Sequence, residues 1–384
     1  MMSSLRKVVV AMDSFKGSLS TEEAGHCVAT SLQNTCPHCQ VEVLPIGDGG
    51  EGTVLALTHA LRGKIITTRA HDSLMRPCSA YYGELANHTA VIEVASTCGL
   101  AQLLPSERNP RFTSSYGCGE VILEALRNGN THILLCLGGS STNDAGMGLL
   151  TALGFRFLDK DGVSLPPYGE SLPKIEHIVC HDVHPSLKQV HFQLLSDVIN
   201  PLCGKHGAAH VYARQKGANS KDILFLDNGL NHFADVVLRE FGKEVRFIAG
   251  SGAAGGIGAG CLGMLPCEIT SGMDYVLRAI RFEEHLQHAD LVITGEGKID
   301  SQSFMGKVLQ RILACCNKHH VPVIALGGQV SDDLTTLPQG LIGAYNIHPQ
   351  GLSLEDAMNS EQTLKDLFTT TSHVIRELLS SGML

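Results

Sequence analysis

The sequence predicts an α/β protein of two domains, in which a mixed α/β domain is inserted into a domain built on a parallel sheet. Apolar, β-rich runs alternate with helical segments at both ends of the chain, a pattern typical of parallel strands joined by crossover helices. From about Lys64 the pattern changes to strands joined by short polar segments. A length of 384 residues suits about two domains. We therefore expect a discontinuous Rossmann-like domain at 1–70 and 286–384, with the second domain at 71–285.

The N-terminal part of the chain predicts two consecutive strand–loop–helix units. Val8–Met12 and Val41–Ile46 are apolar runs typical of buried strands. The capping-box pattern at Ser20–Glu23 opens a helix that reaches about Leu32. A second helix follows the second strand and is closed by Gly63.

In the rest of the chain, the spacing of apolar residues predicts further strands and helices. Further strands are expected at 65–70, 79–84, 90–95, 133–137, 190–195, 291–293, 321–326 and 341–345. Further helices are expected at 120–126, at 145–153, within 251–265, from about Ser303, and in the last segment. The last helix carries its large apolar residues on one face, which indicates a core position and not a partner site.

The composition argues against several classes of function. The formal net charge is −9 and the sequence contains no run of Lys and Arg, so a nucleic-acid surface is not expected. No stretch is apolar over ~18 residues and Met1–Lys7 lacks the apolar region of a signal peptide, so we expect a cytoplasmic protein without membrane contact. Thirteen scattered cysteines fit a reducing compartment. The pair Cys36 and Cys39 lies between a helix and a strand, which does not favour redox chemistry.

Polar residues follow two of the predicted strands directly. Asp13 and Lys16 follow the first strand, at the edge of a parallel sheet where a nucleotide phosphate often lies. Asp197 follows the strand at 190–195 and is a candidate metal ligand or base. A solvated loop in the first case and a helix-capping aspartate in the second are the structural alternatives.

The loop Gly47–Thr53 combines four glycines with two acidic residues. Glycines such as Gly49 and Gly50 are costly unless the backbone turns sharply or approaches a ligand closely. Asp48 and Glu51 would place carboxylates beside that ligand. A pair of ordinary tight turns is the alternative reading.

The segment Gly138–Asp144 ends a predicted buried strand with an unusual concentration of small polar residues. A helix N-cap needs one such residue, whereas this segment has several that can donate to an oxyanion. The candidates are Gly139, Ser140, Ser141, Thr142, Asn143 and Asp144.

The segment Leu291–Lys307 repeats the same design and predicts a nucleotide phosphate site. An apolar strand at 291–293 is expected to stop where Gly295 and Gly297 permit a tight turn. Charged groups follow at Glu296, Lys298, Asp300 and Lys307. The glycines would let the nucleotide approach the backbone, the carboxylates would hold a metal ion, and the lysines would hold phosphate.

Standard nucleotide motifs do not explain these loops. At Gly306-Lys307 the P-loop pattern fails, because Ser301 replaces its first glycine and Val308 its Ser/Thr. The dinucleotide pattern GxGxxG lacks its third glycine, because Asp300 occupies that position, which argues against a dehydrogenase. The protein-kinase motifs are missing, and the histidines show no HExxH frame.

Taken together, these loops resemble the bacterial-type glycerate kinase family (glycerate kinase type 1). The matching blocks run in family order from about residue 8 to 330. They are 12–20, 47–53, 90–95, 137–146, 196–202, 215–218, 252–259, 290–302 and 306–307. The sequence departs from the family pattern at Cys118 and Arg214, where threonine and proline are usual.

The resemblance implies ATP-dependent phosphorylation of D-glycerate, with ATP and Mg²⁺ as cofactors. It also implies two α/β domains with the active site in the cleft between them. The product expected is 2-phosphoglycerate, with 3-phosphoglycerate possible. Alternatives are a kinase for another small hydroxy acid or sugar acid, and a non-catalytic nucleotide-binding protein. The partner expected is a small molecule, and the protein is expected to be a monomer or a homodimer.

Phosphoryl transfer needs charge neutralisation and a proton acceptor, which suggests roles for the candidate residues. Asp197, Glu296 and Asp300 would share the metal-ligand and base roles, with Asp300 as the first candidate for the base. Lysines would hold phosphate or the glycerate carboxylate; the candidates are Lys16, Lys307 and Lys216.

Overall fold

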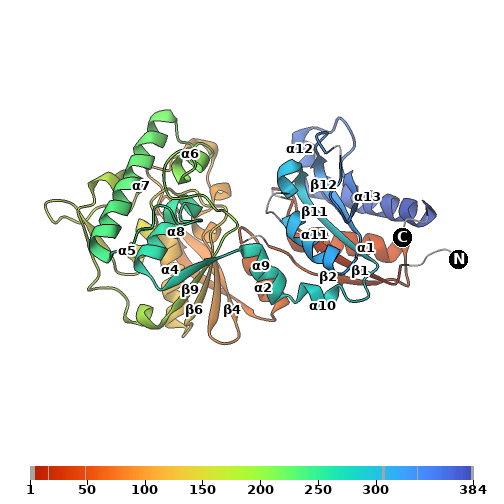
Figure 1. Cartoon of the computed structure of the whole chain (residues 1–384), viewed down its shortest axis with the longest axis horizontal. Coiled ribbons are helices and arrows are strands. Elements are labelled where there is room, and N and C mark those ends of the chain that lie inside the picture. Colours follow the sequence, from red (N-terminus) through yellow and green to blue (C-terminus); the bar gives the residue numbers. More distant parts are fainter. Residues whose placement is uncertain (1–4, 16, 48, 305–307, 335, 382–384) are drawn as a thin grey trace. The chain divides into compact units, whose positions relative to one another are not determined.

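The computed structural model describes the whole chain except residues 1–4, 16, 48, 305–307, 335 and 382–384. Its internal contacts divide the chain into two compact units (Figure 1). Unit 1 comprises Met1–Asp48 and Met273–Leu384, and unit 2 comprises Gly49–Gly272. The domain limits expected from the sequence, after 70 and after 285, lie further along the chain and stay a prediction.

Unit 1 contains a five-stranded sheet in the order β13-β12-β11-β1-β2, with every neighbouring pair parallel. Its strands are β1 (Lys7–Met12), β2 (Gln40–Val43), β11 (Leu291–Ile299), β12 (Val323–Val330) and β13 (Leu341–Asn346). The central strand β11 and its neighbour β1 come from opposite ends of the chain. The parallel, discontinuous sheet expected from the sequence is therefore confirmed.

Helices α1 (Thr21–Thr35) and α13 (Ser360–Ser381) lie side by side against this sheet (Figure 1). The capping box expected at Ser20 is present, because its side chain accepts from the Glu23 N–H at 3.2 Å. Ser31 ties the two helices together through a 2.8 Å hydrogen bond to the Phe368 carbonyl. Alternate residues of β1 join the same apolar core. The other helices of unit 1 are α9 (Gly272–Ala279), α10 (Phe282–His285), α11 (Val308–Lys318) and α12 (Leu354–Ala357).

The tight turn expected at Gly295 and Gly297 is wrong, because β11 continues through both glycines to Ile299. Gly295 pairs with Met12 on one side and with Leu326 on the other. A Cβ atom at Gly295 would overlap the Leu326 carbonyl oxygen. Glycine at this position therefore allows close packing between strands. The helix expected from about Ser303 is a short 3₁₀ segment at Ser301–Phe304, and α11 begins only at Val308.

Unit 2 contains a six-stranded mixed sheet in the order β10-β9-β6-β5-β4-β3. Its strands are β3 (Lys64–His71), β4 (Pro77–Leu85), β5 (Thr89–Glu93), β6 (His132–Cys136), β9 (His191–Leu195) and β10 (Cys267–Thr270). The four strands from β10 to β5 are parallel, and β4 pairs antiparallel with both β5 and β3. A separate two-stranded antiparallel sheet pairs β7 (Arg156–Leu158) with β8 (His177–Val179). The mixed character expected for the inserted region is confirmed.

The helices of unit 2 are α2 (Thr53–Ala60), α3 (Ala95–Cys98), α4 (Tyr116–Arg127), α5 (Met147–Ala152), α6 (Ala208–Tyr212), α7 (Ser220–Phe241) and α8 (Ala253–Met264). All helices of unit 2 except α2 contribute buried residues to an apolar core. The long α7 starts at a capping box on Asn219 and ends at Gly242, which has a φ of 67°. Among the described helices of both units, none combines the length and apolarity needed to cross a membrane.

We predict that Gly295→Ala lowers the free energy of unfolding by about 2–4 kcal/mol, because overpacking between strands cannot be relieved by a side-chain movement. The matched control is Gly351→Ala, since Gly351 has a φ of 87° and open space around its Cα. That variant carries backbone strain of only ~1–2 kcal/mol. Urea unfolding of both variants checks the prediction, which fails if Gly295→Ala is no worse than its control.

Candidate active site

The sequence-predicted site residues fall into two groups, one in each unit. Asp13, Gly295, Glu296, Gly297 and Asp300 belong to unit 1. The remaining described candidates belong to unit 2, on segments 49–51, 139–144, 197 and 216. Lys16, Asp48 and Lys307 lie outside the described residues.

Asp13 lies at the carboxyl end of β1, against the neighbouring strand β11. Its backbone N–H donates to the Gly295 carbonyl at 2.9 Å. Its carboxylate accepts from the Ser14 N–H at 2.7 Å, and the residue is 7% exposed. The loop that follows β1 therefore lies next to the glycine-containing end of β11, as expected for neighbouring parallel strands.

Glu296 and Asp300 lie at the carboxyl end of β11, beyond the point where its pairing with β1 ends. Both residues are half-buried. Asp300 forms an ion pair with the exposed Lys298 at 3.4 Å. The Asp300 N–H donates to the Ser303 hydroxyl at 3.2 Å, which holds the chain after the strand. Carboxylates at such an edge can hold a hard cation or accept a proton.

In unit 2, three loops meet at the carboxyl ends of β6 and β9. The Gly138 N–H donates to the Gly49 carbonyl at 3.1 Å, and Leu137 N–H donates to the Leu195 carbonyl at 3.1 Å. A Cβ atom on Gly138 would lie 2.5 Å from the Gly50 Cα, so only glycine allows this approach. The structure thus brings the glycine loop before α2 to the polar loop after β6.

Glu93 is a buried carboxylate that the sequence reasoning did not single out. It ends β5, is 1% exposed, and accepts from the Val54 N–H at 2.6 Å. This bond holds the first turn of α2 and therefore the preceding loop with Glu51. The signal available in the sequence was an acidic residue inside the apolar run 90–95.

The hydrogen bonds of the Asp144 carboxylate indicate a structural role for this residue. It is fully buried, and its carboxylate accepts from the Ser115 N–H and hydroxyl, both at 2.8 Å. It also accepts from the N–H groups of Gly146 at 3.1 Å and Gly148 at 3.2 Å. Burial raises the pKa of Asp144, and these donors counteract part of that rise. Ser115, which the sequence reasoning missed, thus fixes the end of the polar loop.

The polar loop contains both paired and unpaired side chains. Ser141 is anchored, because its N–H and its hydroxyl donate to the Cys98 carbonyl at 2.7 and 2.8 Å. The Thr142 hydroxyl and both ends of the Asn143 amide are buried without a hydrogen-bond partner among the described residues. Such groups are rare in native proteins and indicate water or a ligand.

Lys216 lies beneath the same loop and is 3% exposed. Its ammonium donates to the Ser140 hydroxyl at 2.9 Å and to the Thr142 carbonyl at 2.8 Å. Burial lowers the pKa of Lys216 to about 7, and the through-space effect of Asp144 opposes this only in part. The structure therefore brings together two sequence candidates, Ser140 and Lys216.

The glycine-rich start of α8 supports the loop from its other side. Residues 254–256 adopt left-handed backbone conformations instead of helical ones. The Ala145 N–H donates to the Gly255 carbonyl at 3.1 Å. A Cβ atom at Gly255 would overlap the Thr142 carbonyl oxygen. The glycines in 252–259 therefore serve close backbone packing against the polar loop.

Asp197 follows β9 directly and is half-buried. The Ser271 hydroxyl donates to its carboxylate at 2.6 Å. Ser271, another residue missed from the sequence, orients this carboxylate at the same strand edge. No group of three or more His, Cys, Asp or Glu in the described part of the chain could hold a metal ion.

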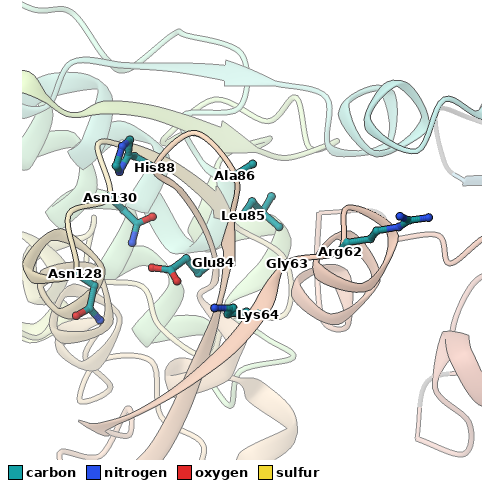
Figure 2. Close-up of a pocket in the computed structure, with 9 residues that line it drawn as sticks. All are labelled: Arg62, Gly63, Lys64, Glu84, Leu85, Ala86, His88, Asn128 and Asn130. Atoms are coloured by element: carbon teal, nitrogen blue, oxygen red, sulfur yellow. The ribbon is translucent and has the colours of Figure 1, made fainter.

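A pocket of about 300 Å³ in unit 2 lies away from these loops (Figure 2). Its lining residues include Lys64, Glu84 and Asn130, and it lies at the amino ends of β5 and β6. Figure 2 shows the Arg62 side chain pointing away from Lys64 and Glu84. Because the polar loops follow the carboxyl ends of the same strands, this pocket is not part of the candidate site.

Comparison with known proteins matches the model of the glycerate kinase family to residues 8–379. A protein named glycerate kinase from Halalkalibacterium halodurans is 38% identical over 94% of this chain and 95% of its own length. One named glycerate 2-kinase from Escherichia coli is 37% identical over 98% of this chain and 99% of its own. The crystal structure of a putative glycerate kinase 2 from Salmonella typhimurium matches with a TM-score of 0.83 and 35% identity, covering 99% of this chain and 100% of the other.

We predict that Lys216 makes stability depend on pH. The folded pKa of about 7 lies below the value of ~10.4 in an unfolded chain. Between these values the unfolded state binds more protons, so the free energy of unfolding rises with pH. Relative to Lys216→Met, the wild type should gain about 2 kcal/mol between pH 7 and pH 9. Urea unfolding at both pH values checks this, and parallel profiles for the two proteins would contradict it.

Proposed function

This chain belongs to the glycerate kinase family and is a kinase, and we propose that it transfers the γ-phosphoryl group of ATP to the 2-hydroxyl of D-glycerate. The observation that carries the proposal is the family match across residues 8–379, which includes both groups of site residues. The relative named glycerate 2-kinase, which aligns along nearly its whole length, supports the choice of hydroxyl.

The unit 1 carboxylates supply the proton acceptor in this proposal. Asp300 accepts the proton of the attacking hydroxyl as it forms the bond to phosphorus. The Asp300 carboxylate lies 3.4 Å from the Lys298 ammonium, which helps to hold it in place. Asp13 and Glu296 add negative charge at the same strand edge, where a cation would be held.

Mg²⁺ fits these donors, because it is usually held by one or two carboxylates together with substrate phosphates. The candidate ligands are Glu296 and Asp300 in unit 1 and Asp197 in unit 2. Bound Mg²⁺ would neutralise charge on the ATP phosphates. The lysines proposed to hold phosphate are Lys16 and Lys307, and the unit 2 loops 49–51 and 139–143 would hold oxygens of nucleotide or substrate.

Incubation with ATP, Mg²⁺ and D-glycerate is expected to yield 2-phosphoglycerate and ADP. Phosphorus NMR of the product identifies the phosphorylated position directly. A 3-phosphoglycerate signal would overturn the assignment of the 2-hydroxyl. A substrate panel of small hydroxy acids and sugar acids tests the acceptor, and faster turnover of another acid would replace D-glycerate.

The carboxylate roles predict large losses of turnover with retained folding. Asp300→Asn should lower kcat by about 10²–10⁴-fold, because a positioned base contributes that much. Glu296→Gln should lower kcat and raise the Mg²⁺ concentration needed for half-maximal rate. Glu377→Gln is the matched control, because its side chain is 59% exposed on α13. The roles are wrong if both site variants, folded by circular dichroism, keep near-native turnover.

A further inference from the structure

Lys216 is a buried amino group whose hydrogen-bond partners carry no charge. It is 3% exposed, and its ammonium contacts the Ser140 hydroxyl and the Thr142 carbonyl. Within the part of the chain that the structure describes, no carboxylate forms an ion pair with it. Buried charges in proteins are normally paired, because removing a lone charge from water is very unfavourable. Lys216 would therefore need a directly paired anion when it is charged, and no described carboxylate provides that pair.

The same loop holds further polar groups that lack partners. The Thr142 hydroxyl and the Asn143 amide are fully buried, and no described residue bonds to them. Orphaned polar groups are costly, so several in consecutive residues beside an uncompensated lysine point to an absent ligand. The Thr142 hydroxyl, the Asn143 Nδ2 and the Lys216 amino group can all donate, which suits a ligand with anionic oxygens, whereas the Asn143 Oδ1 can only accept.

Asp144 does not fill the role of the missing anion. Its Oδ2 accepts from Ser115 and Gly148 and its Oδ1 accepts from Gly146, so neutral donors already stabilise its charge. The negative charge of Asp144 also limits the charge that a ligand can carry here. One lysine could not offset the repulsion between this carboxylate and a multiply charged triphosphate. A ligand with a single negative charge fits this balance.

We propose that Lys216 and the polar loop 140–143 bind the carboxylate of the hydroxy-acid substrate, and that Lys216 takes up one proton when this acid binds. The inference rests on the proposed function and deepens it by assigning the acid end of the substrate to unit 2. Above pH 7 Lys216 of the free enzyme is mainly a neutral amine, whose two N–H groups donate to the Thr142 carbonyl and the Ser140 hydroxyl. Binding brings a carboxylate, and a proton from solvent converts the amine to an ammonium that pairs with it.

Two opposite effects on Lys216 produce this coupling. In the free enzyme, burial lowers the pKa of Lys216 to about 7. A carboxylate within ~4–6 Å favours the charged form and raises the pKa again. Asp144 is the titratable group that acts on Lys216 in both states. Uptake should therefore approach one proton at pH 8 and fall toward zero at pH 6, and the affinity for the acid should fall about tenfold per pH unit above 7.

Calorimetric titration of the full-length protein with D-glycerate tests the proposal. Titrations in two buffers of different ionisation enthalpy give the number of protons taken up. We expect close to one proton at pH 8 for the wild type and none for Lys216→Met. Lys221→Met is the matched control, because Lys221 is exposed on α7, and it should keep the wild-type uptake. Binding without uptake in the wild type, or uptake that persists in Lys216→Met, overturns the proposal.

Thr142→Val provides an independent test if Lys216→Met does not fold. Because the Thr142 hydroxyl has no partner in the described structure, its removal should leave thermal stability unchanged or raise it. The dissociation constant for D-glycerate should nevertheless rise about tenfold, the effect of one lost hydrogen bond to a charged group. Lower stability with unchanged affinity would show a structural role and overturn the ligand assignment.

Other outcomes separate this inference from the proposed function. If D-glycerate is phosphorylated but binds without proton uptake, the inference fails and the function stands. If a non-hydrolysable ATP analogue alone causes the uptake at pH 8, the loop binds nucleotide and the carboxylate assignment is wrong. If D-glycerate neither binds nor reacts, the proposed function fails and the inference fails with it.

Discussion

The close approach of glycine backbones at the strand ends is the constraint on which the unit 2 site depends. Gly138 packs onto Gly50 and donates to Gly49, which brings the loop before α2 to the end of β6. Gly255 packs onto Thr142 from the opposite side. A single methyl group at these positions would force backbone apart, and no side-chain movement could relieve it. The polar loop is thus held between two backbone contacts.

Two buried ionisable residues beside this loop, Asp144 and Lys216, differ in how their charges are compensated. Asp144 is surrounded by donors from Ser115, Gly146 and Gly148, which compensate its burial and fix the start of α5. Lys216 has two neutral acceptors and a lowered pKa, so its compensation is incomplete. A satisfied charge stabilises structure, whereas an unsatisfied one favours binding of an opposite charge. This contrast separates structural from binding roles among residues that look alike in the sequence.

The positions of the site loops could be predicted because parallel strands place their carboxyl ends at one edge. Asp13, Asp197 and the segment 138–144 follow strands as expected. The interpretation of Gly295 failed, because a glycine that permits a turn also permits close packing between strands. Glu93 and Ser271 were missed because their importance depends on bonds to Val54 and Asp197, which are distant in the sequence.

By itself the sequence determined the fold class, the strand-end loops and the family, since these follow from periodicity and from ordered motifs. Tertiary structure decided which polar residues are satisfied and which are not. Ser141 bonds to Cys98, whereas the neighbouring Thr142 hydroxyl has no described partner. The physical reason is that hydrogen bonding and desolvation depend on groups brought together by folding, and residue type alone does not specify them.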